Sequence, residues 1–109
     1  MTGKVLVVAV VLGLAGAGSA VAQQPDGAAL YARTCASCHG AQGTPTPAMA
    51  KAMTGIPDFA ARTTSAVPDS VLREAIVNGK GRMMASYKTR LTPDQVTALI
   101  TYIRTLAKH

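Results

Sequence analysis

The chain has 109 residues, of which 49% are hydrophobic and 15% are charged, and its formal net charge is +6 at pH 7. A chain of this length forms one domain, and with no Trp, one Phe and three Tyr it cannot build a large core by itself. The positive charge does not indicate a nucleic-acid partner, because aromatic side chains are not interleaved with the basic ones. The composition favours a small domain whose centre is filled by something besides its own side chains.

The N-terminal segment has the pattern of an export signal. Lys4 precedes an apolar run over residues 5–17, and small residues continue to Ala22. This pattern predicts a signal peptide over residues 1–22, cleaved after Ala22, and a periplasmic domain over residues 23–109. Cleavage would remove 22 of the 109 residues, leaving 87, and would lower the net charge to +5 because Lys4 is lost. The alternative is an uncleaved membrane anchor, although the run is short for a bilayer, and the mature chain has no predicted span.

The first half of the mature chain contains short helices and one long loop. Pro25-Asp26 opens a helix that runs into residues 35–39. Residues 40–57 are rich in Gly, Pro, Thr and Ala, which predicts a loop with a short turn of helix near residues 48–53. Another brief helix is predicted to start at Pro57-Asp58-Phe59.

Two clearer helices follow. Pro68-Asp69 begins one with an apolar stripe, and Asn78-Gly79 ends it with residues that tolerate a left-handed cap. The run Thr92-Pro93-Asp94-Gln95 combines an N-cap hydroxyl, a first-turn proline and a capping-box glutamine, and helical apolar spacing continues from there to Lys108. With no useful strand alternation in the mature chain, the sequence predicts an all-α fold of about three to five helices.

Both cysteines and one of the two histidines lie in the run Cys35-Ala36-Ser37-Cys38-His39. This spacing is typical of c-type haem attachment, in which each thiol adds to one vinyl group and the histidine becomes an axial ligand of the iron. A redox dithiol would need a surrounding strand and helix pattern, which the sequence lacks. A zinc site would need further ligands, and only His109 remains. A plain disulfide would leave His39 without a role.

The sixth ligand of a haem iron would have to be a soft or neutral donor, and the mature chain offers four methionines. Met49 and Met53 are four residues apart and are interpreted as one face of a short helix packed on the haem edge. Met83 and Met84 lie in a Gly-rich loop between two helices, where a ligand can be presented. One of this pair is the predicted sixth ligand.

The chain resembles a small monohaem class I c-type cytochrome over residues 27–106. The likeness consists of three segments besides the Cys-x-x-Cys-His run. Leu30-Tyr31 precedes that run, and residues 76–81 (Ile-Val-Asn-Gly-Lys-Gly) precede Met83 and Met84. Tyr102-Ile103-Arg104 lies in the last helix. The resemblance implies the cytochrome c fold, wrapped around one covalently attached haem c with its iron. It also implies that Gly27 and Tyr31 pack against the last helix.

The resemblance assigns further residues but leaves two choices open. Counting back from Tyr87 favours Met84 as the axial ligand, whereas counting forward from the Gly side gives Met83. A proline carbonyl that supports His39 is expected in the loop after the motif, and Pro47 is favoured over Pro45.

Axial ligation by His and Met leaves no open iron position, which favours one-electron transfer over catalysis. Lys80, Arg82, Lys88 and Arg90 lie on either side of Met83 and Met84, and they predict redox protein partners with an acidic docking face. The alternatives are a haem subunit of a larger redox enzyme complex, or a gas or redox sensor with a labile sixth ligand.

Overall fold

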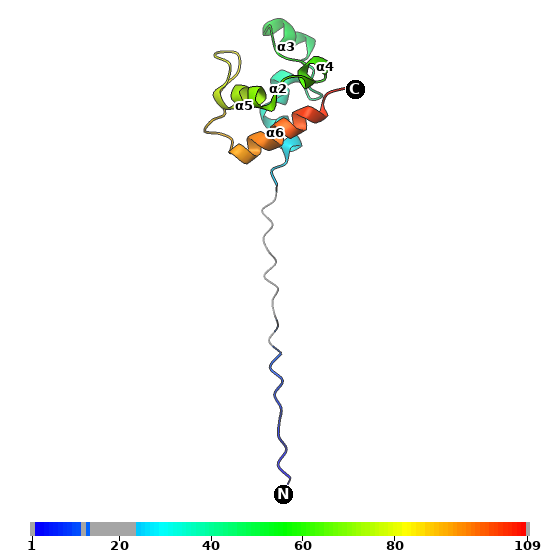
Figure 1. Ribbon diagram of the computed structural model, residues 1–109, viewed down its shortest axis with the longest axis vertical. Coiled ribbons are helices and arrows are strands. Elements are labelled where there is room, and N and C mark those ends of the chain that lie inside the picture. The colour runs from blue at the N-terminus through cyan, green and yellow to red at the C-terminus, as the bar shows by residue number, and fades with distance from the viewer. Residues whose placement is uncertain (1, 12, 14–23, 109) are drawn as a thin grey trace.

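The computed structural model describes residues 2–11, 13 and 24–108. These ranges contain six helices, which are labelled in Figure 1: α1 (Gly27–Thr34), α2 (Ala36–His39), α3 (Pro47–Ala52), α4 (Arg62–Ser65), α5 (Asp69–Asn78) and α6 (Pro93–Thr105). The described part of the chain has no strand and a single isolated antiparallel bridge, between Lys80 and Met84. The all-α prediction is confirmed. The six helices exceed the expected three to five because α2 and α4 are single turns of four residues each.

The clearest helix boundaries follow the predicted capping residues. At the start of α6, the Thr92 hydroxyl accepts a hydrogen bond from the Gln95 amide, and the Gln95 side chain accepts one from the Thr92 amide. The side chain of Asp26 caps α1 in a similar way. The end of α5 is also as predicted, since Gly79 follows with φ of 75°. The final helix ends at Thr105, before the predicted Lys108.

The prediction of a helix that starts at Pro57 is wrong, because α4 begins only at Arg62. Two hydrogen bonds hold the intervening residues in a turn. The amide of Phe59 donates to the carbonyl oxygen of Gly43 at 2.9 Å, and the Asp58 carboxylate accepts from the backbone amide of Ala60 at 2.9 Å. Residues 58–60 therefore form a turn in place of the predicted helix start, and the Phe59 side chain is buried in the core.

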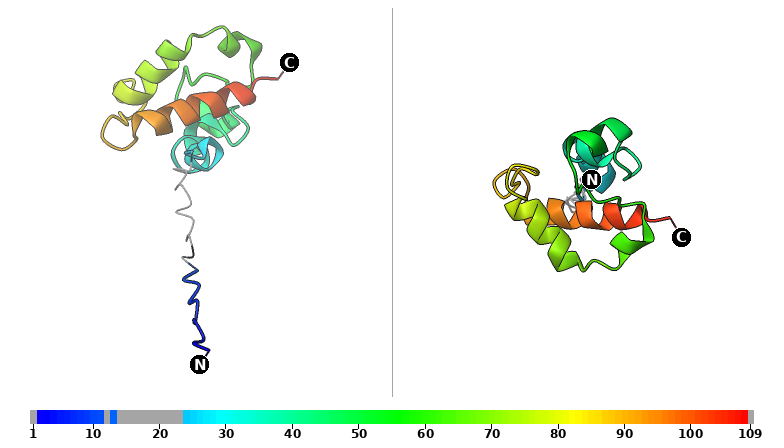
Figure 2. Two further views of the ribbon diagram at one scale, coloured as in Figure 1. Left: turned by 60° about the horizontal axis from the view of Figure 1, so that its bottom comes forward. Right: turned by 90° about the horizontal axis from the view of Figure 1, so that it is seen from above.

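The centre of the fold is the crossing of α1 and α6, which Figure 2 shows from two further directions. A Cβ atom on Gly27 would lie 2.2 Å from the carbonyl oxygen of Ala98, so this close approach requires glycine. Tyr31 is buried, and its ring centroid lies 5.2 Å from that of Tyr102. The predicted packing of Gly27 and Tyr31 against the last helix is confirmed. Around the crossing lie further buried side chains: Leu30, Phe59, Leu72, Ile76, Val96, Leu99, Ile100 and Ile103.

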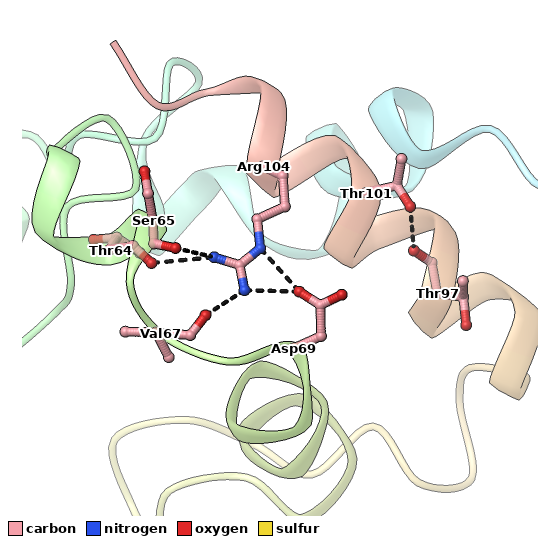
Figure 3. Close-up of polar contacts among 7 residues, drawn as sticks. All are labelled: Thr64, Ser65, Val67, Asp69, Thr97, Thr101 and Arg104. Atoms are coloured by element: carbon pink, nitrogen blue, oxygen red, sulfur yellow. Dashed lines mark hydrogen bonds and ion pairs between the residues drawn. The ribbon is translucent and has the colours of Figure 1, made fainter. Parts of the chain in front are cut away.

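Arg104 on α6 fixes the segment between α4 and α5 (Figure 3). Its guanidinium pairs with the Asp69 carboxylate at 2.7 Å and donates hydrogen bonds to the carbonyl oxygens of Thr64, Ser65 and Val67. These carbonyl groups belong to the end of α4 and the turn after it. One side chain on α6 therefore joins the end of α4, the turn after it and the start of α5.

Residues 2–11 contain neither helix nor strand (Figure 1). The valine and leucine side chains of this segment are exposed. The predicted cleavage position after Ala22 lies outside the described residues. Within the ranges that the structure describes, no helix is both long enough and apolar enough to cross a membrane.

Candidate haem site

A cavity of about 620 Å³ gathers the predicted site residues from distant parts of the chain. Cys35, Cys38 and His39 line it, as do Met83 and Met84. The lining also contains the core side chains of Phe59, Leu72, Ile76 and Ile103, and the half-buried Ile56. A second cavity of about 550 Å³ lies beside the starts of α1 and α6, and its lining contains no Cys, His or Met. The larger cavity is therefore the candidate site.

The Cys-x-x-Cys-His run directly follows α1: Cys35 is the junction between the two helices, and the other four residues form α2. The amide of Cys35 donates to the Tyr31 carbonyl at 2.9 Å, and the amide of His39 donates to the Cys35 carbonyl at 2.9 Å. The two cysteines form no disulfide. Burial raises the pKa of the Cys35 thiol, and a hydrogen bond from Thr34 lowers it in part. A reactive redox dithiol instead needs a lowered thiol pKa.

His39 is held in a defined orientation. Its ring stacks on Phe59, with the ring centroids 4.6 Å apart and the planes 18° from parallel. Its Nδ1 atom is buried and makes no hydrogen bond within the described residues. Burial lowers the pKa of His39, and the backbone of Pro57 partly offsets this shift. Burial is the larger effect, so the net pKa of His39 is lowered, which favours the neutral imidazole that binds metals.

The backbone of a proline acts on His39. Pro57 lines the cavity, and its backbone influences the pKa of His39. Pro47 is an exposed residue in the first turn of α3, and neither it nor Pro45 belongs to the lining. The reason is the course of the chain, since α3 carries it away from His39 before residues 53–57 return to the cavity.

Gly40 closes the turn that carries His39. Its carbonyl oxygen accepts a hydrogen bond of 2.7 Å from the buried Tyr31 hydroxyl. Its φ is 85°, and a Cβ atom there would lie 1.9 Å from the carbonyl oxygen of Thr44. This side of the cavity is thus fixed by contacts among residues close in sequence.

The two methionines differ in exposure although both line the cavity. Met84 is half-buried and packs against the hydrophobic core, whereas Met83 is 46% exposed. The loop that carries them is closed by a hydrogen bond of 2.9 Å from the Lys80 amide to the Met84 carbonyl. Met53 also lines the cavity, but Met49 does not.

This lining fits a covalently attached haem. Two thiols, one imidazole and the methionine thioethers line one largely apolar cavity. The cavity volume lies within the usual range for cofactor pockets.

The family model for cytochrome c matches residues 25–107. The chain belongs to the cytochrome c family. It is also similar to the solved structure of the KustC0563 c-type cytochrome, with 36% identity, a TM-score of 0.69, and coverage of 76% of this chain and 99% of that one. A mutant of that cytochrome matches with 33% identity, a TM-score of 0.66, and coverage of 74% and 98%. No curated protein matches the chain.

Family membership implies covalently attached haem c with its iron, and electron transfer as the general function. Sequence reasoning missed two residues of the site, Phe59 and Pro57. A signal for Phe59 was present, because a lone phenylalanine in a chain without Trp belongs in the core. Pro57 gave no comparable signal, since its position beside His39 depends on the return of the loop.

Proposed function

We propose that the chain is a periplasmic one-electron carrier whose haem is attached through Cys35 and Cys38 and whose iron is bound by His39 and Met84. The observation that carries this proposal is the single cavity lined by all four side chains. When bound, the haem supplies a reversible one-electron couple. His39 and Met84 would occupy both axial positions, exclude external ligands and favour the reduced state.

The choice of Met84 over Met83 is supported by burial. Met84 packs against the core, so its side chain already lies in apolar surroundings, whereas about half of Met83 faces solvent. The Met83 amide donates to the Lys80 carbonyl oxygen at 3.1 Å, so the backbone on which the two methionines differ in burial is held by a hydrogen bond.

The test is the optical spectrum of the holoprotein and of two matched variants. The wild type and Met83→Ala should show the thioether-to-iron charge-transfer band in the oxidised state, and Met84→Ala should lose it. Reduced wild type should bind carbon monoxide slowly, and reduced Met84→Ala rapidly. Loss of the band in Met83→Ala alone would transfer the ligand role to Met83. A wild type without the band and with rapid carbon monoxide binding would favour the sensor alternative.

The support for His39 is proposed to be the Pro57 carbonyl. It is the acceptor that influences the pKa of His39, and a carbonyl that accepts from Nδ1–H would fix the imidazole orientation and increase its basicity. Pro47 and Pro45 lie outside the lining, so we do not assign this role to them.

The proposed partner is a redox protein with an acidic docking face. Lys80, Arg82, Lys88 and Arg90 are all exposed, and they lie on the segment that carries the methionines. A basic rim beside the site would attract negative charge and accelerate encounter at low salt. Ferricyanide, an anion, should therefore oxidise the reduced protein more slowly as salt rises, whereas a cationic cobalt oxidant should react faster.

A matched pair of charge reversals locates this effect. Arg82→Glu should weaken the salt dependence of the oxidation rate with ferricyanide. Arg62→Glu should change this dependence less, because Arg62 lies on α4 and not on the segment that carries the methionines. Equal effects of the two variants would mean that only net charge matters.

Export is proposed from the N-terminal pattern, and the removal of residues 1–22 is tested directly by the N-terminal sequence of the haem-loaded protein. A new terminus at Gln23 is expected. An intact terminus in the membrane fraction would favour the anchor.

A further inference from the structure

We propose that the hydroxyl group of Tyr87 is the tether that keeps the Met loop, residues 79–91, closed over the haem cavity. Tyr87 would then be a positioning residue that controls how readily the sixth ligand leaves the iron. The inference rests on the proposed ligation by a methionine of this loop. It assigns to Tyr87 a role beyond packing.

The first observation is a long-range hydrogen bond. The Tyr87 hydroxyl donates to the carbonyl oxygen of Thr34 at 3.0 Å, across 53 residues of sequence. Thr34 is the last residue of α1, so its carbonyl has no partner within that helix. It also directly precedes Cys35, and both residues line the cavity. The bond therefore joins the Met loop to the helix end that presents the haem attachment site.

The second observation is that the backbone of the same residue binds a different helix. The Tyr87 amide donates to the Ile76 carbonyl at 3.0 Å, and the preceding Ser86 hydroxyl donates to the Val77 carbonyl at 2.6 Å. Both acceptors lie in the last turn of α5, where carbonyl groups also lack helical partners. Tyr87 thus connects the ends of α5 and α1, and it enters the cavity lining between them.

The third observation concerns the tyrosine ring. The Arg90 guanidinium lies over it, 4.9 Å from the centroid, and the amides of Arg90 and Leu91 both donate to the Tyr87 carbonyl at 3.0 Å. The ring is therefore confined on the solvent side by a cation and positioned by a turn that leads into α6. Its hydroxyl is directed to Thr34 without the help of the methionines.

The remainder of the loop has few anchors of its own. Among the described residues, the hydrogen bonds of residues 80–84 all lie within this stretch. The Lys80 amide donates to the Met84 carbonyl oxygen, and the Met83 amide donates to the Lys80 carbonyl oxygen. Opening the loop, which must precede binding of an external ligand to the iron, would break the bond from Tyr87 to Thr34. Removing that bond should therefore favour the open state without removing the methionine.

The three tyrosines of the chain give a matched set of variants. Tyr87→Phe removes the tether. Tyr31→Phe removes a hydroxyl bond of similar kind, to Gly40 on the His39 side. Tyr102→Phe removes a hydroxyl with no hydrogen bond among the described residues, and it serves as the baseline. Each is made in the holoprotein, and imidazole affinity is measured for the oxidised form together with the unfolding midpoint in urea.

Tyr87→Phe should bind imidazole roughly threefold to tenfold more tightly than the wild type, which corresponds to the loss of one hydrogen bond in the closed state. Tyr31→Phe should lower the unfolding midpoint without this gain in affinity, and Tyr102→Phe should change neither. If Tyr87→Phe lowers the midpoint but leaves imidazole affinity unchanged, the residue is only structural and the inference is overturned. A wild type that lacks the thioether-to-iron band would instead overturn the proposed ligation, so the two failures are distinguishable.

Discussion

The two ligand-bearing sides of the cavity are built in different ways. The His39 side is local, because Cys35, Cys38 and His39 all lie in one stretch of five residues that includes the single turn of α2. The buried Tyr31 hydroxyl donates a hydrogen bond to the carbonyl oxygen of Gly40, the residue after His39. The Met84 side is a loop without helix, held mainly by bonds from Ser86 and Tyr87 to the ends of distant helices.

This difference separates attachment from ligand exchange. A ligand on a tightly packed turn can be displaced only if the turn unfolds, whereas a ligand on a loop can leave through local opening at a lower free energy. We therefore expect damage on the His39 side to lower the stability of the whole domain. Damage on the Met84 side should instead appear first as weaker axial ligation.

The largest expected effect is that of Gly40→Ala on the His39 side. The new Cβ atom would lie 1.9 Å from the Thr44 carbonyl oxygen, in a backbone conformation with φ of 85°. Because backbone must move, we expect a loss of about 3 kcal/mol or more in the free energy of unfolding. Urea titration of the holoprotein measures it.

Gly55→Ala is the control for Gly40→Ala. Gly55 has φ of 87°, but no atom lies within 4 Å of its added Cβ, so only the backbone conformation is penalised. The expected loss is about 1 to 2 kcal/mol. Equal losses in the two variants would show that the His39 turn is not tightly packed, and the comparison of the two sides would fail.

A smaller effect is expected from Gly79→Ala on the Met84 side. Its Cβ would lie 2.6 Å from the Met84 carbonyl oxygen and 2.8 Å from the Ser86 amide nitrogen, so the loop must shift away from α5. We expect a loss of about 2 kcal/mol in the free energy of unfolding. The thioether-to-iron band should also weaken while the haem stays attached, which absorption spectra of the oxidised protein would show.

Gly81→Ala, in the same loop, gives the matched comparison. Gly81 has φ of 59° and open space around its added Cβ. It should cost about 1 kcal/mol and leave the band in place. If both variants weaken the band equally, loop strain in general controls ligation, and the contact between Gly79 and Met84 has no special part in it.

The sequence allowed the local side to be predicted better than the loop side. The Cys-x-x-Cys-His turn, the capping box at Thr92 and the end of α5 at Gly79 all depend on neighbouring residues, and the structure has them where they were expected. The bond from Tyr87 to Thr34 and the approach of Pro57 to His39 depend on how loops return after long excursions. Local propensity contains no information on such returns, so these contacts required the three-dimensional structure.

The smallest expected effect is a pH dependence that arises on the His39 side. Burial is the main cause that raises the pKa of Tyr31, so the folded protein keeps the hydroxyl proton where the unfolded chain has lost it. The contribution of Tyr31 to stability is therefore complete below about pH 10, the ordinary tyrosine pKa, and it falls at higher pH. The free energy of unfolding of the wild type should decrease by up to about 1.4 kcal/mol per pH unit more steeply than that of Tyr31→Phe. Urea titrations of both proteins between about pH 9 and pH 11 measure this difference. Parallel pH profiles would mean that the Tyr31 hydroxyl reaches solvent in the folded protein, and the His39 side would then be as open to local fluctuation as the Met loop.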